Sequence, residues 1–162
     1  MTSIILKFVE SYTPSSEAKI VFAWNGRHAA DFDDANMAFR TAVGEYFEEN
    51  TQACSLPLIA ALYRAETQWA KEAWCVRSVV AELAQELLQR GGVAYLNVYF
   101  AGACCGMDAF MESGNISLSE TRCEELLAYC QASAVNADAD ADSREKWAML
   151  AERFAYLLAG AA

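Results

Sequence analysis

The chain has 162 residues, is 55% hydrophobic and carries a formal net charge of -10. A chain of this length buries roughly 70% of its unfolded surface, so we expect one domain over residues 1–162 that needs no disulfide or metal. Its 12 basic residues are scattered among 22 acidic ones. That balance argues against direct binding to nucleic-acid backbones, and it disfavours binding to anionic membranes.

The beginning of the chain predicts a cytoplasmic protein. Lys7 and Glu10 interrupt a short apolar run, which is unlike a signal peptide. No stretch reaches the roughly 18 apolar residues of a membrane-spanning helix. The six cysteines are therefore expected to be reduced thiols that pack as small apolar side chains.

Residues 1–50 predict a β-β-β-α portion. Ser3–Val9 and Lys19–Trp24 have strand-like composition, and Arg27–Phe32 would be the returning strand. The Asn-Gly pair at 25–26 is a strong signal for a tight hairpin, because both central residues of such a turn need positive φ. We therefore expect a small three-stranded antiparallel sheet.

A helix is expected from Asp33 or Asp34, as the N-cap, to about Asn50. Its apolar residues recur at helical spacing, so that one side can cover the apolar face of the sheet. That side comprises Phe39, Ala42, Val43, Tyr46 and Phe47. The opposite side is acidic.

Residues 55–160 predict a helical portion. Ser55 followed by Pro57 indicates a helix start. Residues 57–90 form either one long helix or two helices joined by a kink, and Gly91-Gly92 ends the segment. For Val93–Ser113 a helix is favoured, with a fourth strand as the alternative.

Two further helices complete the expected fold. A capping box of Ser117 and Glu120 opens the first, which ends near Ala132, and Asp142 caps the second. An apolar stripe runs along the second from Trp147 to Leu158. The fold class expected from the sequence is therefore α+β: a three-stranded sheet with a covering helix, followed by a bundle of four or five helices.

No motif predicts catalysis, a cofactor or a metal ion. His28 is the only histidine, and no cysteine pair has the C-x₂-C spacing of zinc sites. The aspartate run 138–142 lacks the glycine and glutamate of a calcium loop, because Ser143 and Met149 occupy those positions. We expect a protein without catalytic residues, metal or cofactor.

The acidic side of the first helix is the predicted functional surface. Concentrated like charge destabilises a fold, so it often serves binding, and it would steer a basic partner protein. The expected function is that of a non-enzymatic acidic protein-binding protein, of which an immunity or antitoxin type of inhibitor of a basic partner protein is one form. The predicted partner-binding residues are Asp31, Asp33, Asp34, Glu45, Glu48 and Glu49.

Two alternatives remain at the level of sequence. The chain could be a small-molecule-binding or catalytic helical domain with an aromatic-lined pocket between helices. It could also be a homodimer whose apolar surplus covers an interface. The residues that would line the pocket are Trp69, Trp74, Tyr95 and Tyr99.

Overall fold

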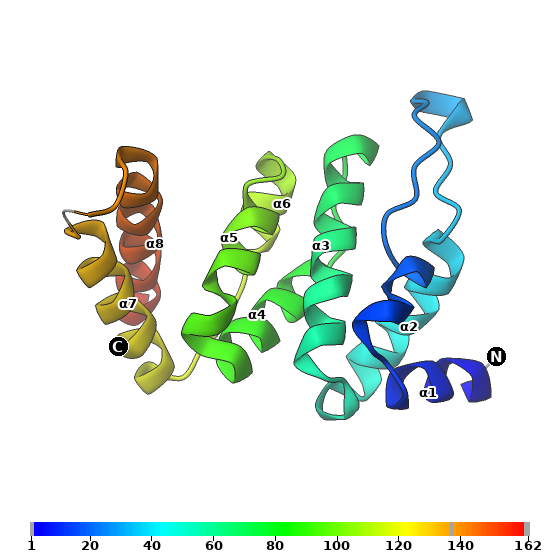
Figure 1. Ribbon diagram of the computed structural model, residues 1–162, viewed down its shortest axis with the longest axis horizontal. Coiled ribbons are helices and arrows are strands. Elements are labelled where there is room, and N and C mark those ends of the chain that lie inside the picture. The colour runs from blue at the N-terminus through cyan, green and yellow to red at the C-terminus, as the bar shows by residue number, and fades with distance from the viewer. Residues whose placement is uncertain (1, 137, 161–162) are drawn as a thin grey trace.

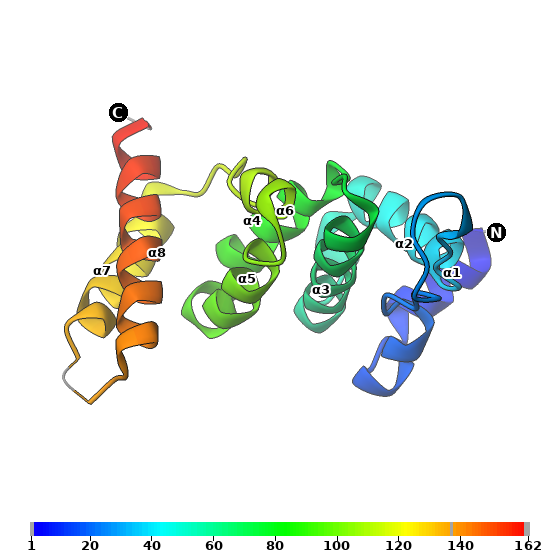
Figure 2. The same cartoon turned by 90° about the horizontal axis from the view of Figure 1, so that it is seen from above.

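The computed structural model describes residues 2–136 and 138–160, and over these ranges the chain is helical, with no strand. The helices stand beside one another in a row along the long axis of the molecule (Figure 1). The view from above shows the same row, with the two ends of the chain at opposite ends of the molecule (Figure 2).

The described residues contain eight α-helices and four short 3₁₀ turns, joined by loops. The α-helices are α1 (Thr2–Glu10), α2 (Met37–Glu49), α3 (Leu56–Ala73), α4 (Val79–Gly91), α5 (Leu96–Ala103), α6 (Met107–Glu112), α7 (Glu120–Ala134) and α8 (Ala141–Gly160). The 3₁₀ turns are η1 (Pro14–Lys19), η2 (Ala29–Asp31), η3 (Thr51–Ala53) and η4 (Gly92–Tyr95).

The expected α+β fold is wrong, beginning with its first strand. Ser3–Val9 lies within helix α1. Ile5, Phe8 and Val9 are buried, a spacing of three and then one that puts them on one side of a helix. The β-branched composition suggested a strand, but the helical period of the buried residues decided the structure.

The second and third strands are also absent from the described residues. Lys19 ends η1, and residues 21–35 form a long excursion, here called the 21–35 loop, whose arms pair through one isolated antiparallel bridge between Trp24 and Asp34. The predicted two-residue turn is also wrong, because Gly26 has φ +77° but Asn25 does not have a positive φ, and the bridge closes a longer loop. A single hairpin without a neighbouring sheet is marginal in water, and here the 3₁₀ turn η2 interrupts the returning arm.

Helix α2 ends at Glu49, close to the predicted end, but begins at Met37 with Asn36 as its N-cap. Neither Asp33 nor Asp34 caps it. Val43 and Phe47 are fully buried on the predicted inner side, and Phe8 of α1 packs edge-on against Phe39 at 5.0 Å between ring centroids. The apolar side of α2 therefore covers helices, not a sheet.

The segment from 56 to 91 forms two helices, which decides between the two alternatives. Helix α3 ends at Ala73, and its C-cap Trp74 has a left-handed backbone with φ 55° and ψ 36°. Ser55 precedes α3 as predicted, and Gly92, with φ +56°, follows the end of α4. The prediction of a helical 93–113 is confirmed by η4, α5 and α6, and the alternative strand is wrong.

The C-terminal helices begin close to, but not at, the predicted caps. Ser119, not Ser117, caps α7, and its hydroxyl accepts from the backbone N–H of Arg122. Asp140 accepts from the N–H and the hydroxyl of Ser143 at the start of α8. Six α-helices follow residue 55 among the described residues, so four or five was an underestimate.

Helix α3 is the centre of the core and packs against α4, α5 and α6. Leu58, Ile59 and Leu62 are fully or almost fully buried. The phenol oxygen of Tyr63 lies 2.8 Å from the Ser113 hydroxyl and links α3 to the end of α6. Among the described helices, none is both long and apolar enough to cross a bilayer.

Candidate binding groove

The 21–35 loop is held at its base by side chains. The Asp34 carboxylate accepts from the backbone N–H of Ala23 at 3.0 Å and of Asn36 at 3.1 Å. The Asn36 amide donates to the carbonyls of Ala18 and Val21. These bonds replace the ladder that a sheet would supply, and they hold the loop where it projects from the row of helices (Figure 1).

A buried ion-pair cluster ties this loop to two helices. Arg40, with no exposed surface, donates to Asp34 at 2.6 Å and to Glu66 of α3 at 2.9 Å. Arg77, in the α3–α4 connection, donates to the same Glu66 oxygen at 3.1 Å and to Thr41 at 2.9 Å. The two arginines balance the two carboxylates, so the cluster adds no net charge and positions the elements around it.

A hollow of about 510 Å³ lies between the 21–35 loop and the C-terminal end of α3. Its wall is mostly apolar and aromatic, and it includes one carboxylate, one imidazole and one thiol. We call it the aromatic hollow. Its lining residues are His28, Ala29, Phe32, Met37, Trp69, Glu72, Ala73, Trp74 and Cys75.

Trp74 is the most unusual residue of this wall. Trp74 is 83% exposed, although tryptophan has the largest apolar side chain. Its left-handed backbone is unfavourable for a residue other than glycine, by roughly 1–2 kcal/mol. Trp74 therefore combines an exposed indole and a strained backbone in the wall of a hollow, and we treat it as a candidate binding residue.

A second hollow, of about 550 Å³, adjoins the first and shares Phe32 and Met37 with it. Asp33 and Glu45, both exposed, stand on its wall. We call this the acidic hollow, and the two together the groove. The other residues that line it are Asp34, Ala38, Thr41 and Ala42.

The structure divides the six predicted acidic residues into three groups. Asp33 and Glu45 line the acidic hollow, whereas Asp34 is buried in the ion-pair cluster and presents no charge to a partner. Asp31, Glu48 and Glu49 are exposed but do not line the groove. Five of the six residues are therefore exposed, and two of these five line a cavity.

Glu48 extends the acidic surface toward α4. The pKa of Glu82, in the first turn of α4, is raised by partial burial and by the negative charge of Glu48. The charge of Glu48 disfavours the ionisation of Glu82, and a positive group placed between the two carboxylates would relieve that repulsion.

The predicted aromatic pocket is half formed. Trp69 and Trp74 both line the aromatic hollow, but Tyr95 and Tyr99 lie elsewhere, in η4 and α5. Tyr99 is fully buried and stacks on Tyr63 with 6.3 Å between ring centroids. Burial raises the pKa of Tyr99 to about 12, so it acts as a hydroxyl donor in the core.

Sequence reasoning missed most of the loop side of the groove. His28, Phe32 and Glu72 line the aromatic hollow, and none was predicted as a binding residue. The available signal was the density of aromatic residues in a short polar segment, with Phe22, Trp24 and Phe32 falling within eleven positions. In the structure these three rings pack on one another at 6.3 Å between centroids.

The groove contains reactive residue types without a catalytic arrangement. His28 and Cys75 both line the aromatic hollow, but no hydrogen bond joins the imidazole to the thiol.

The buried cysteines outside the groove are unreactive. Burial raises the pKa of Cys54 to about 11 and of Cys130 to about 12, so these thiols stay protonated at neutral pH. Within residues 2–136 and 138–160 no three His, Cys, Asp or Glu side chains cluster as a metal site.

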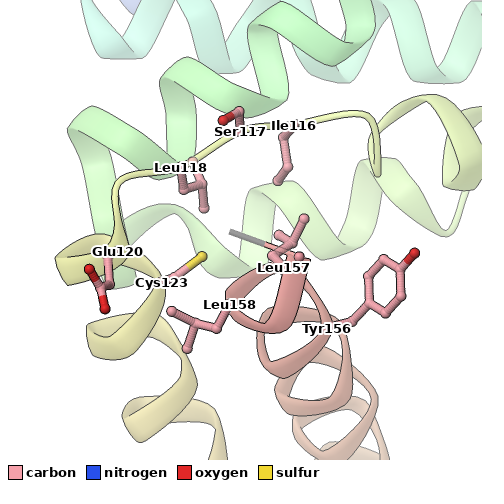
Figure 3. Close-up of a pocket in the computed structure, with 9 residues that line it drawn as sticks. Ile116, Ser117, Leu118, Glu120, Cys123, Tyr156, Leu157 and Leu158 are labelled. Atoms are coloured by element: carbon pink, nitrogen blue, oxygen red, sulfur yellow. The ribbon is translucent and has the colours of Figure 1, made fainter. Parts of the chain in front are cut away.

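Two smaller hollows lie at the other end of the molecule. One of about 230 Å³ lies between residues 116–118, α7 and the end of α8, where Ile116, Leu118 and Leu157 approach one another (Figure 3). The other, of about 280 Å³, contains Arg153, which donates to the Phe110 carbonyl and stacks over its ring. Neither has an exposed tryptophan or an acidic neighbour hollow.

No protein-family model matches the sequence, and neither a curated protein nor a solved structure matches it. Function is therefore inferred from the shape and chemistry of the described residues.

Proposed function

We propose that the chain is a non-enzymatic protein-binding protein whose groove takes a basic, partly apolar segment of a partner protein. The observation that carries this proposal is the groove itself, with an aromatic hollow beside one that carries Asp33 and Glu45. Apolar concave surface supplies affinity, and carboxylates on its wall select positive groups.

Charge on the rest of the surface supports the same partner. The net charge of -10 attracts basic proteins over a distance and accelerates their association. Glu48, Glu49 and Asp31 extend the negative surface beyond the groove. An inhibitor of the immunity or antitoxin kind would use such a surface to cover a basic site on its partner.

Trp74 and Trp69 supply the contacts expected of an interface centre. Tryptophan is among the residues that contribute most to binding energy, and Trp74 is exposed without a partner to cover it. The buried Nε1–H of Trp69 donates to no acceptor among the described residues.

We place this binding in the cytoplasm. All six cysteines are free thiols, and two of them, Cys75 and Cys104, are exposed. A reducing compartment keeps exposed thiols from forming disulfides between molecules.

The test selects peptides against the purified protein from a display library of random 12-residue sequences. We expect enriched peptides to combine Lys or Arg with apolar residues, and to bind more weakly as salt rises. The double variant Asp33→Lys/Glu45→Lys should weaken binding at least about tenfold, because it reverses the charge of the acidic hollow. Affinities would be measured by fluorescence anisotropy.

A matched control separates the effect of charges in the groove from the effect of the total charge. Glu124→Lys/Glu145→Lys changes the total charge by the same amount on exposed positions of α7 and α8. Peptides that weaken equally in both double variants, or that are neutral or acidic, would overturn the proposal. Retained affinity in the α7–α8 control variant supports it.

A further inference from the structure

We propose that the aromatic hollow holds the guanidinium group of an arginine side chain from the partner, flat against Trp74 and paired with Glu72. This inference rests on the proposed function and names the group that its groove recognises. Three observations carry it: the arrangement of the rings, the position of one carboxylate, and the exposure of Trp74.

The rings form walls at different angles around the hollow. Phe32 and Trp69 stand nearly perpendicular, with 80° between their planes and 6.5 Å between centroids. His28 and Trp74 lie 6.5 Å apart at 46°. All four rings line the same hollow, and a cation is attracted to the face of an aromatic ring, most strongly to that of tryptophan.

Glu72 gives the hollow its charge. Glu72 is a lining residue of the hollow, and its carboxylate pairs with Lys71 at 3.6 Å, whose side chain is 61% exposed. An exposed pair of this kind is weak, so Glu72 remains available to a ligand. The buried cluster of Arg40 and Arg77 is already balanced by Asp34 and Glu66 and adds no opposing charge.

The shape of the site favours arginine over lysine. A guanidinium is planar, stacks on an indole and presents parallel N–H groups to a carboxylate. An ammonium is compact and strongly hydrated, so it loses more hydration free energy when it packs against aromatic rings. Trp74, at 83% exposure, offers an uncovered face for stacking.

The experiment uses the whole protein and three small probes: N-acetyl-arginine amide, its citrulline analogue and N-acetyl-lysine amide. Citrulline keeps the shape of arginine but is neutral. The readout is alkylation of Cys75, which lines the hollow, followed by mass spectrometry, with the exposed Cys104 as an internal control. We expect the arginine probe to protect Cys75 at concentrations at least about tenfold below those of citrulline, and not to protect Cys104.

Variants test each part of the site. Glu72→Gln should remove most of the preference for arginine over citrulline, and Trp74→Leu should weaken both arginine and lysine. Tyr156→Leu is the matched control, because Tyr156 is also exposed, at 79%, but lies on α8. Equal protection by citrulline and arginine, or no protection of Cys75 by arginine, would overturn the inference.

The outcomes separate this inference from the proposed function. Library peptides that require Asp33 and Glu45 while the arginine probe leaves Cys75 unprotected would overturn the guanidinium site alone. Protection of Cys75 by arginine without any groove-dependent peptide would support the site and overturn the protein-binding role.

Discussion

Arg40 shows how one side chain can organise a surface that it does not reach. It is fully buried, and its guanidinium joins the base of the 21–35 loop to α2 and α3 through Asp34 and Glu66. A buried ion pair adds little net stability against an apolar replacement of both partners, but removing one partner leaves an unpaired charge. The cluster therefore serves chiefly to set the geometry of the groove.

A substitution at Arg40 tests whether the ion-pair cluster depends on this residue. Arg40→Met leaves the buried Asp34 without its cation and Glu66 with Arg77 alone, and we expect it to lower the free energy of unfolding by about 3–5 kcal/mol. Arg64→Met is the control, because its pair with Glu17 is partly exposed and should be worth less than about 1 kcal/mol. Urea titrations of both variants measure the difference, and equal losses would contradict a special role for Arg40.

At the scale of elements, two helical glycines have opposite roles. In α2, a Cβ on Gly44 would meet only Val79 Cγ2 at 3.9 Å, an ordinary contact. In α5, a Cβ on Gly102 would come within 2.3 Å of the Tyr63 ring. Gly102 therefore permits the close approach of α5 to α3, whereas Gly44 only lowers the helix propensity of α2.

Alanine at these two positions should change stability in opposite directions. We expect Gly44→Ala to raise the free energy of unfolding by roughly 0.5–1 kcal/mol through helix propensity. Gly102→Ala should lower it by about 1–3 kcal/mol, because the buried Tyr63 ring must move. Thermal or urea unfolding of the two single variants provides the measurement, and a loss in both would contradict the assignment for α2.

For the whole molecule, the row of helices predicts an extended shape. A compact domain of this length has a radius of gyration of about 15 Å, and the row seen in Figures 1 and 2 is longer in one direction than a sphere. Small-angle scattering should give a larger radius at the mass of one chain. A scattering mass of two chains would instead favour the homodimer alternative.

Composition and helical period by themselves determined much of this protein. The end of α2, the start of α3 at Ser55, the stop at Gly92 and the apolar stripe of α8 follow from caps, glycine and spacing within a few residues of each position. These signals are local, so they survive whatever the rest of the chain does. Prediction from local sequence was wrong for Ser3–Val9, because this short segment has both a strand-like composition and a helical spacing of apolar residues.

Tertiary structure alone decided which charges and rings meet. Nothing local distinguishes Asp34 from Asp33, yet one is buried against Arg40 and the other lines the acidic hollow. Trp69 and Trp74 share a cavity with His28, which lies more than forty positions earlier in the chain. Burial and contact between distant segments depend on how helices pack, and that packing turns an acidic, aromatic sequence into a groove.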